Sequence, residues 1–445
     1  MTASAAAAGF DIARLGRMTE AIAKGEEYPN VHAVLIVKDG RLVYEEYFKG
    51  EDRRWRDGAL RRVELAFDRD TLHDVRSVGK SVTSALAGIA LAAGALPSLD
   101  TPLIRLVPEH AARATEAARR ITLRHALTMS AGFDWNEQAV PYTDSTNHSE
   151  RMYASADPVG FLLGRPAAAE PGSVWAYNSG LPALVGLAIA RGTRTPFGQY
   201  ARDVLFEPLG VTRAEWTGPP AWRDLPELRW EGSPGWGHVA NPAGSLWLRP
   251  RDLAKFGALY LDRGRWQGRQ VIPAEWVRES TRRHIAIRDS TSDYGEHGYG
   301  YLWWHDRYRT PEGEFEVHTA VGNGAQRVFV IPSLRILVVH LAGRYNDPDA
   351  DWMPERLMLE HILPAMESGP ASRIDSLFAE HDRADVPGCA VGVYPRGRAG
   401  VREGVRHGEP GAWPAGDAAH RVRHRLDRDA ARSGRTGCRR PRRCT

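Results

Sequence analysis

The stretch Asp74-Val75-Arg76-Ser77-Val78-Gly79-Lys80-Ser81 joins a reactive pair of side chains to the start of a buried helix. Residues 78–94 are apolar and rich in Ala and Gly, which predicts a helix that is buried on most sides. Ser77 and Lys80 are three residues apart, so their side chains share one helix face. Ser77 lies at the helix N-terminus, where backbone N–H groups and the helix dipole stabilise negative charge. Because a lysine in a dry site loses its proton more easily than in water, the spacing predicts a serine nucleophile activated by Lys80.

Two later segments carry side chains suited to the same chemistry. The segment 175–180 (WAYNSG) offers Tyr177 as a proton relay and Ser179 as a further hydroxyl. The segment 317–324 (VHTAVGNG) precedes a hairpin, and its His318 can bind or orient a substrate. Each segment alone also fits a structural explanation, namely a strand end before an Asn-Ser-Gly turn and a histidine within a strand. Their order along the chain after Ser77 favours the catalytic interpretation.

The strand and helix patterns predict one α/β domain whose sheet is completed by both halves of the chain. Asp39-Gly40 joins the β-rich runs 32–38 and 41–48, and this dipeptide favours a type I′ hairpin. A second antiparallel pair, 326–331 and 334–341, turns at Pro332-Ser333. The segment 211–249 is rich in Trp, Pro and Gly and reads as a loop region. Helical patterns are expected at 10–24, 78–94, 122–130, 180–191, 250–263, 273–283 and 353–366.

Taken in order, these segments resemble those of the serine β-lactamase and penicillin-binding-protein-like hydrolases, in the class C-like branch that includes esterases and 6-aminohexanoate-dimer hydrolases. The resemblance covers about residues 30–366. It is carried by the opening hairpin and by SVGKS (77–81), SLDTPLIRLVPE (98–109), ITLRHALTMSAGFDW (121–135), YNS (177–179), RPRDLAKFGALYL (249–261), YGYLWW (299–304) and HTAVGNG (318–324). It implies an α/β fold of the α+β sandwich type, with an antiparallel sheet flanked by helices and a mostly helical lobe carrying Ser77.

The resemblance also implies roles for individual residues. Ser77 would be the acylated nucleophile, Lys80 its activating partner, and Tyr177 the general base that later protonates the leaving group. Backbone N–H groups of Ser77 and Val321 would form the oxyanion hole. No cofactor and no metal is implied.

Two departures from the family pattern bear on the substrate. The family's β-lactamases usually read Tyr-x-Asn, whereas Ser179 holds the third position here. They carry Lys-Thr-Gly on the active-site strand, whereas this chain has His318-Thr319-Ala320, and a neutral histidine holds a substrate carboxylate less well than a lysine. We therefore expect hydrolysis of a small-molecule ester or small amide, with Ser179, His318 and Val321 contacting the substrate.

Other functions stay open at this stage. The same residues fit a β-lactamase or a D-Ala-D-Ala carboxypeptidase, and the fold also fits a non-catalytic binding or sensor protein. The intact set of Ser77, Lys80 and Tyr177 argues against the non-catalytic alternative. An Arg-rich tail binds polyanions without specificity, so no specific nucleic-acid partner is expected. The sequence does not indicate the oligomeric state.

Charge and cysteine content separate the body of the chain from its last fifty residues. The formal net charge is +4, yet residues 396–445 hold fourteen arginines against five acids and so carry +9, which leaves −5 for residues 1–395. The cysteines, Cys389, Cys438 and Cys444, all lie late in the chain, so the body cannot use thiolate chemistry. No apolar run is long enough to span a membrane and no signal peptide is recognised, so a cytoplasmic location is expected.

These differences predict three regions. Residues 1–367 form the hydrolase domain, 368–398 begin a truncated second copy of it, and 399–445 form an Arg/Gly/Pro-rich tail that is disordered or frameshifted. The second copy is suggested by Ala33-Val34 and Gly40-Arg41, which recur as Ala390-Val391 and Gly397-Arg398 at an offset of 357. A helix at 373–381 and a strand at 389–394 are expected there. A genuine basic linker or tail is the alternative.

Overall fold

The computed structural model describes residues 2–56, 59–231, 239–287, 295–310, 313–366, 390–393, 401–404 and 422–423. The chain divides into two compact units, Met1–Ala8 with Ile12–Leu363 and Gly9–Asp11 with Pro364–Thr445. The larger unit contains the sheet, the helical lobe and all the residues discussed as a site below. The boundaries predicted at 367/368 and 398/399 stay predictions, and the expected helix at 373–381 lies outside the described residues.

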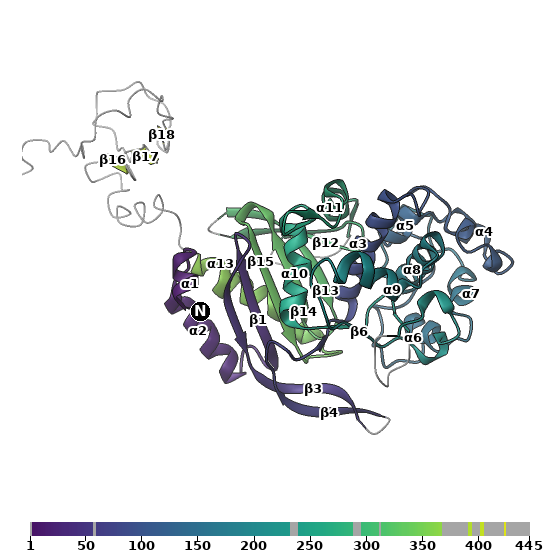
Figure 1. The fold of residues 1–445 in the computed structure, drawn as a ribbon, viewed down its shortest axis with the longest axis horizontal. Coiled ribbons are helices and arrows are strands. Elements are labelled where there is room, and N and C mark those ends of the chain that lie inside the picture. Colours follow the sequence, from purple (N-terminus) through teal and green to yellow (C-terminus); the bar gives the residue numbers. More distant parts are fainter. Residues whose placement is uncertain are drawn as a thin grey trace, which may run out of the picture. The chain divides into compact units, whose positions relative to one another are not determined.

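The centre of the larger unit is an antiparallel sheet in the order β10-β11-β12-β13-β14-β15-β1-β2 (Figure 1). Strand β1 from the start of the chain pairs with β15 from its later part, so both halves complete the sheet as predicted. Every residue of β14 and β15 is buried, which requires cover on both faces of the sheet. The strands of this sheet are β1 (Val31–Lys38), β2 (Arg41–Tyr47), β10 (Ile285–Ala286), β11 (Gly295–Tyr299), β12 (Trp304–Thr310), β13 (Gly313–Gly322), β14 (Gln326–Ile331) and β15 (Ile336–Ala342).

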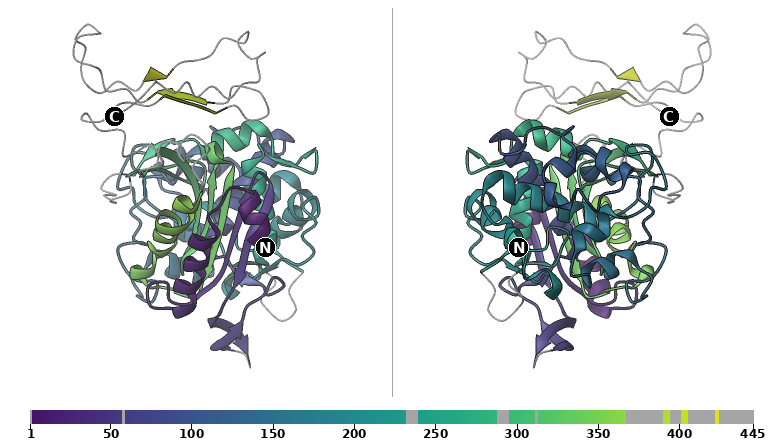
Figure 2. Two further views of the ribbon diagram at one scale, coloured as in Figure 1. Left: turned by 90° about the vertical axis from the view of Figure 1, so that its left-hand side faces the viewer. Right: turned by 90° about the vertical axis from the view of Figure 1, so that its right-hand side faces the viewer.

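The first hairpin forms as the sequence predicts. Strands β1 and β2 are joined by Asp39 and Gly40, whose φ angles of 52° and 75° are those of a type I′ turn. A second hairpin, β3 (Lys49–Arg56) and β4 (Ala59–Ala66), was not predicted, and Figures 1 and 2 show it projecting from one end of the sheet. Its strands are rich in charged residues and lack the apolar alternation by which a half-buried strand is recognised.

Helices flank the sheet and build a separate lobe, as expected. In Figure 1, α2 lies on one side of the sheet and α10 on the other, while α4 to α9 gather in the lobe. The helices are α1 (Thr2–Ala7), α2 (Ile12–Lys24), α3 (Gly79–Ala92), α4 (Glu116–Arg120), α5 (Leu123–Leu127), α6 (His148–Tyr153), α7 (Pro158–Leu163), α8 (Gly180–Thr193), α9 (Phe197–Ala201), α10 (Pro250–Leu261), α11 (Ala274–Thr281), α12 (Met353–Leu357) and α13 (Leu363–Ala365). None of the described helices is long and apolar enough to cross a membrane.

Helix α3 is the buried helix that the sequence predicts after Ser77. Eleven of its fourteen residues are buried, because Ala, Gly and Ser let neighbouring elements approach its backbone. One such neighbour is α11, whose Trp276 ring occupies the space that a Cβ at Gly88 would need. The helix therefore has little room to move, and it carries the residues at its N-terminus on a rigid base.

Short elements connect these larger parts. A small sheet in the order β5-β7-β6 joins the segment before Ser77 to the 211–249 region, which holds β6, β7 and two 3₁₀ turns. The short strands are β5 (His73–Asp74), β6 (Glu215–Trp216), β7 (Leu246–Leu248), β8 (Arg265–Trp266) and β9 (Arg269–Gln270). The 3₁₀ and π turns are η1 (Arg76–Val78), η2 (Leu103–Arg105), η3 (Pro108–His110), η4 (Arg202–Phe206), η5 (Pro220–Trp222), η6 (Pro226–Leu228), η7 (Pro332–Leu334), η8 (Pro348–Ala350) and η9 (Met358–Ile362).

The described residues of the smaller unit form three short antiparallel strands, β16 (Ala390–Val393), β17 (Val401–Gly404) and β18 (Val422–Arg423). Strand β16 falls within the predicted strand 389–394. Ala390 pairs with Gly404, and subtracting the offset of 357 from both numbers gives Ala33 and Tyr47, which pair in the first hairpin. All four residue pairs of β16 and β17 repeat the register of β1 and β2 in this way. The pairing supports the hypothesis of a second domain copy, which stays a prediction.

Candidate active site

Ser77 lies in the 3₁₀ turn η1, directly before α3. The residue before it, Arg76, has a φ of 50°, a left-handed conformation that is costly for a residue with a side chain. Asp74 holds this arginine in place by accepting from its backbone N–H at 2.9 Å and by pairing with its guanidinium at 3.0 Å. The Arg76 guanidinium also lies over the ring of Tyr345, 4.7 Å from its centre. These contacts fix the sharp turn from which the Ser77 side chain emerges.

Lys80 lies one turn further along, with its ammonium nitrogen beside the Ser77 hydroxyl. Lys80 Nζ is 2.8 Å from Ser77 Oγ and donates to the carbonyl oxygen of Ala243 at 2.7 Å. The lysine is only 2% exposed, and this burial lowers its pKa to about 8, although the Glu137 carboxylate acts in the opposite direction. A substantial fraction of Lys80 is therefore neutral near pH 8 and can accept a proton from Ser77.

Tyr177 completes the group of residues around Ser77. It lies in the segment before α8, and Lys80 Nζ is 4.9 Å from the centre of its ring. Burial raises the pKa of Tyr177 well above its usual value of 10, and a hydrogen bond with the Ser77 side chain acts against this rise. The tyrosine is consequently a neutral phenol at physiological pH, which is the form that can protonate a leaving group; its expected role as general base stays a prediction.

Two close backbone approaches hold the turn of Ser77 against its surroundings. A Cβ at Gly244 would lie 2.9 Å from the carbonyl oxygen of Arg76, so the loop carrying Ala243 fits against the turn because glycine stands there. A Cβ at Gly322, the last residue of β13, would lie 2.4 Å from the carbonyl oxygen of Val75. The end of β13 is thereby placed next to Ser77.

The edge of β13 beside this turn has no strand neighbour on the β12 side within the described residues. Strand β12 begins at Trp304, which pairs with Thr319, so the pairing stops before Val321. On its other side Val321 pairs with Arg327 of β14. A strand end with an unpaired edge next to a nucleophile offers backbone groups to a reacting carbonyl oxygen.

An open cavity of about 380 Å³ connects these residues. Ser77, Tyr177 and Val321 all line it, and Trp304 forms part of its wall. The volume is within the range of small-molecule sites. Three carboxylate residues line the cavity, Glu137, Asp347 and Asp351, and its described lining contains no Lys, Arg or His. The charged side chains that line the cavity are thus acidic, with Asp347 paired to Arg344 and the Lys80 ammonium group beside Ser77.

The wall beside Tyr177 is aromatic. Trp304 stacks with the Tyr177 ring at a centroid distance of 6.3 Å, and Trp175 and Tyr299 lie within 5.4 Å of the Trp304 centroid. Such a wall excludes water from the side of the nucleophile and offers apolar surface to a substrate.

Glu137 is a site residue that the sequence reasoning missed. It is 1% exposed, and its carboxylate accepts from the Ser179 N–H at 2.8 Å, the Ser179 hydroxyl at 2.5 Å, the Trp135 indole at 2.8 Å and the Tyr142 hydroxyl at 3.0 Å. This carboxylate therefore joins the loop after α5 to the N-terminus of α8. No local pattern marks the residue, because its donors come from positions up to 42 residues away.

The structure brings Ser77, Lys80, Tyr177 and Val321 together, but it does not bring Ser179 or His318 to the same cavity. The Ser179 hydroxyl donates a hydrogen bond to the Glu137 carboxylate, and Ser179 is not among the described residues that line the cavity. His318 lines a different cavity, because side chains alternate along β13 and His318 and Val321 point to opposite faces. The expected contact of these two side chains with substrate is therefore not supported by their positions.

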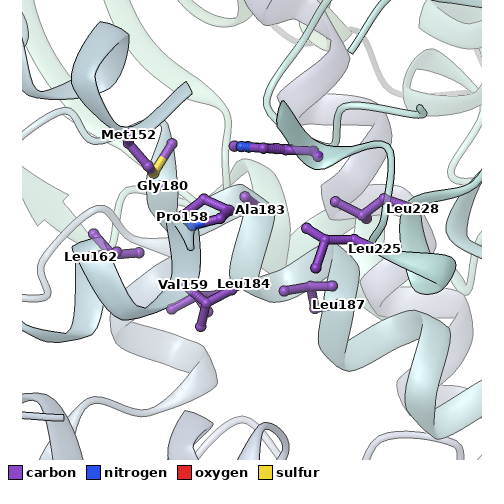
Figure 3. Close-up of a pocket in the computed structure, with 11 residues that line it drawn as sticks. Met152, Pro158, Val159, Leu162, Gly180, Ala183, Leu184, Leu187, Leu225 and Leu228 are labelled. Carbon is purple, nitrogen blue, oxygen red and sulfur yellow. The ribbon is translucent and has the colours of Figure 1, made fainter. Parts of the chain in front are cut away.

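Figure 3 shows a third hollow, which lies among apolar side chains of the helical lobe. Its volume is about 10 Å³, too small for a ligand and at the lower limit for a single water. Gly180, where α8 begins, has its Cα against Leu162 and Met152, and a Cβ there would lie within 3.0 Å of both. The hollow is a small packing void of the interior. The close contacts of Gly180 fix the start of α8, next to Ser179.

Comparison with known proteins identifies a family whose model spans the sheet, the helical lobe and the cavity of Ser77. The family model described as Beta-lactamase matches residues 21–360. Among curated proteins, the esterase EstB of Burkholderia gladioli is 29% identical over 189 residues, which cover 41% of this chain and 46% of the esterase. The match thus spans about half the length of that relative.

Solved structures show the same fold at low identity. A Bacillus anthracis structure assigned as a 6-aminohexanoate-dimer hydrolase aligns with a TM-score of 0.60 and 16% identity, covering 79% of this chain and 83% of that chain. The simvastatin synthase LovD of Aspergillus terreus aligns with a TM-score of 0.58 and 19% identity, covering 80% of this chain and 99% of that chain. The fold is therefore β-lactamase/transpeptidase-like, as the sequence predicts.

Proposed function

Because the chain belongs to the beta-lactamase family, we propose that it is a serine hydrolase that cleaves esters or small amides through an acyl-enzyme on Ser77. The observation that carries the proposal is the buried pair of Lys80 Nζ and Ser77 Oγ, 2.8 Å apart, with a lysine pKa of about 8. At a pH near this value a fraction of the lysine side chains is unprotonated, and an unprotonated lysine can activate a serine hydroxyl as its base. This is the arrangement that a nucleophile with its own base requires.

The first half-reaction follows from these positions. Neutral Lys80 takes the proton of the Ser77 hydroxyl while Ser77 Oγ bonds to the carbonyl carbon of the substrate. The carbonyl oxygen becomes an oxyanion that faces the backbone N–H groups of Ser77 and Val321. Support for this placement comes from the packing of the β13 end against Val75 and from the position of Val321 in the cavity wall.

Tyr177 is proposed to protonate the leaving group. Its raised pKa keeps the phenol neutral, so the hydroxyl can donate to the leaving oxygen or nitrogen as the bond from the carbonyl carbon breaks. The proton that Lys80 took from Ser77 is proposed to return to the phenolate, because Lys80 and Tyr177 are both hydrogen-bonded to the Ser77 side chain. Water attacks the acyl-enzyme in the second half-reaction, with the same groups moving the protons in reverse.

The charges of the cavity favour a neutral or cationic substrate. A β-lactam antibiotic or a peptide C-terminus brings a carboxylate, which needs a basic group to hold it. The described lining of the cavity carries Glu137, Asp347 and Asp351 and no basic side chain. Esters and amides without a carboxylate are therefore the proposed substrates, in preference to β-lactams and D-Ala-D-Ala peptides.

The test is a rapid-mixing assay with p-nitrophenyl acetate and p-nitrophenyl butyrate. We expect a burst of p-nitrophenol equal to the enzyme concentration and a covalent acyl adduct on Ser77 in the mass spectrum. A fluorophosphonate probe should label the same residue, and the Ser77→Ala variant serves as the unlabelled control. Absence of turnover, burst and label on this panel would contradict the proposal and favour a non-catalytic binding protein.

Substrate class is tested separately with nitrocefin and a D-Ala-D-Ala peptide. We expect kcat/KM for both to be lower than for the esters, because each brings a carboxylate into an acidic cavity. A higher kcat/KM for either compound would overturn the substrate class and leave the role of Ser77 intact.

A further inference from the structure

A second and larger cavity, of about 860 Å³, lies on the other face of β12 and β13. His305 pairs with His318, and both line this cavity, whereas their neighbours Trp304 and Val321 line the cavity of Ser77. Side chains alternate between the two faces of a strand, so the two cavities are separated by the thickness of the sheet. The end of α10, the helix α11 and the turn at Arg335 complete the walls of the second cavity.

This second cavity is rich in arginine, and we name its six lining arginines the arginine cluster. They come from four segments: three lie in α11 or directly after it, and the others follow α10, lie in β12 and lie in the turn before β15. The arginine cluster consists of Arg263, Arg278, Arg282, Arg283, Arg307 and Arg335. The lining contains two carboxylates, Glu275 and Glu316.

The ion pairs of the cluster leave it able to bind an anion. Arg335 pairs with Asp39 at 3.1 Å, and these side chains are 49% and 55% exposed. Three more cluster arginines have carboxylate partners: Arg307 pairs with Glu314 and Glu316, Arg278 with Glu275 and Glu279, and Arg282 with Glu279. The arginine side chains in these pairs are 39–67% exposed. Exposed pairs of this kind contribute little to stability and rearrange easily. A guanidinium also has five N–H donors, so one carboxylate partner leaves donors available.

An unsatisfied polar atom lies in the wall of the same cavity. His318 Nδ1 is buried and has no hydrogen-bond partner among the described residues. The His318 ring faces the His305 ring at a centroid distance of 5.6 Å. A buried imidazole nitrogen without a partner is costly. A flip of the His318 ring would turn this nitrogen toward the cavity, where an oxygen atom of a bound anion would accept from it.

We propose that the second cavity binds a small polyanion, a molecule with two or more phosphate or carboxylate groups, through the arginine cluster and His318. Arginine suits this ligand because its planar guanidinium matches the oxygens of phosphate and carboxylate groups in pairs. The cavity volume is within the range of small-molecule sites. The ligand would contact the face of β13 that points away from the Ser77 cavity. Its binding does not depend on the proposed hydrolysis.

Calorimetric titration of the full-length chain with tripolyphosphate and with citrate tests the proposal. We expect saturable binding of one molecule per chain for at least one of these probes, and their relative affinity distinguishes a phosphate ligand from a carboxylate ligand. Arg263→Ala should weaken binding about tenfold or more, because charge-assisted hydrogen bonds are strong. His318→Phe keeps a ring and removes the nitrogen atoms, so it should weaken binding by a smaller factor.

The matched control is Arg105→Ala, which removes an exposed arginine in η2 outside the second cavity. Thermal unfolding without ligand checks that each variant is folded. Equal weakening by Arg105→Ala and Arg263→Ala would mean attraction to net charge alone and would overturn the proposal. No binding of either probe up to about 1 mM, a range that covers weak sites, would overturn it as well.

Discussion

The two cavities on either face of β12 and β13 differ in charge although the same two strands supply walls to both. One is lined by three carboxylates and contains the serine nucleophile, and the other is lined by six arginines and two histidines. Trp304 and His305 are neighbours in β12, yet they face different cavities. A shift of one residue along a strand therefore decides which of the two cavities a side chain lines. Substitutions on the two faces should therefore affect different measurements.

Removing the nucleophile should have the largest effect on hydrolysis. Ser77→Ala is expected to lower kcat for p-nitrophenyl butyrate by about 10⁴-fold or more, since a unit of nucleophile and base loses nearly all its activity with one member. Steady-state and burst kinetics provide the measurement. Polyanion binding to the second cavity should not change. Loss of both hydrolysis and polyanion binding in this variant would contradict the independence of the two cavities.

Tyr177→Phe should lower kcat by about 10²–10⁴-fold, the range for loss of a positioned proton donor. The ring would stay in place against Trp304, so thermal stability should be nearly unaltered. The loss should be smaller for p-nitrophenyl esters than for alkyl esters, because p-nitrophenolate leaves without a proton. Equal losses for the two leaving groups would argue against Tyr177 as the donor.

The pH dependence of kcat/KM reports on Lys80. Burial lowers the pKa of this lysine to about 8, and the neutral form is the reactive one. Below pH 8 the rate should therefore fall about tenfold for each pH unit, and above pH 8 it should level off. The measurement is kcat/KM for p-nitrophenyl acetate from pH 6 to 9.5, corrected for spontaneous hydrolysis. A profile that is flat through pH 8 would contradict the role of Lys80 as the base.

Glu137→Gln should lower the stability of the protein, because Glu137 anchors the wall of the Ser77 cavity. The substitution replaces one acceptor oxygen by an NH₂ group that meets the donors of Ser179, Trp135 and Tyr142. We expect the free energy of unfolding to fall by about 2–3 kcal/mol, as for loss of hydrogen bonds to a charged group. Urea denaturation measures the change. Glu170→Gln, which removes an exposed pair with Arg120, is the matched control and should leave stability almost unaltered.

His318→Ala should have the smallest effect on hydrolysis, within about twofold of the wild-type rate, because His318 lies on the face of β13 opposite Val321 and contacts none of the proposed reacting groups. His318 lines the cavity of the arginine cluster and not the cavity of Ser77. Assays with p-nitrophenyl butyrate provide the test. A large rise in KM with this variant would return His318 to the substrate site, as the sequence suggested.

Local patterns predicted the parts of the fold and site that depend on neighbours in the chain. The Asp39-Gly40 turn follows from the backbone preference of two residues, and the proximity of Ser77 and Lys80 follows from their spacing on one helix. The sheet order was predicted in outline, since strands at both ends of the chain had to pair. The segment 175–180 offered Tyr177 as a proton relay, but only the resemblance implied that Tyr177 and Val321 act together with Ser77.

Features that depend on distant contacts were not predictable in the same way. Glu137 accepts hydrogen bonds from Trp135 and Tyr142 of its own segment, but its contact with Ser179, 42 residues away, could not be read from that segment. The position of His318 depends on how the pleat of β13 is set against the turn of Ser77. The sequence pattern predicts that side chains alternate between the two faces of β13, but it does not predict which face points toward Ser77.

Arg76, with its left-handed backbone before Ser77, has a consequence for engineering. Its conformation costs about 1–2 kcal/mol relative to an ordinary one, and the pairing with Asp74 and the contact with Tyr345 offset that cost. Glycine at this position would remove the strain but also both contacts, so the gain in heat resistance would come with a less constrained serine. Directed evolution for thermostability should therefore keep position 76 fixed and seek its improvements on the exposed hairpin β3–β4 instead.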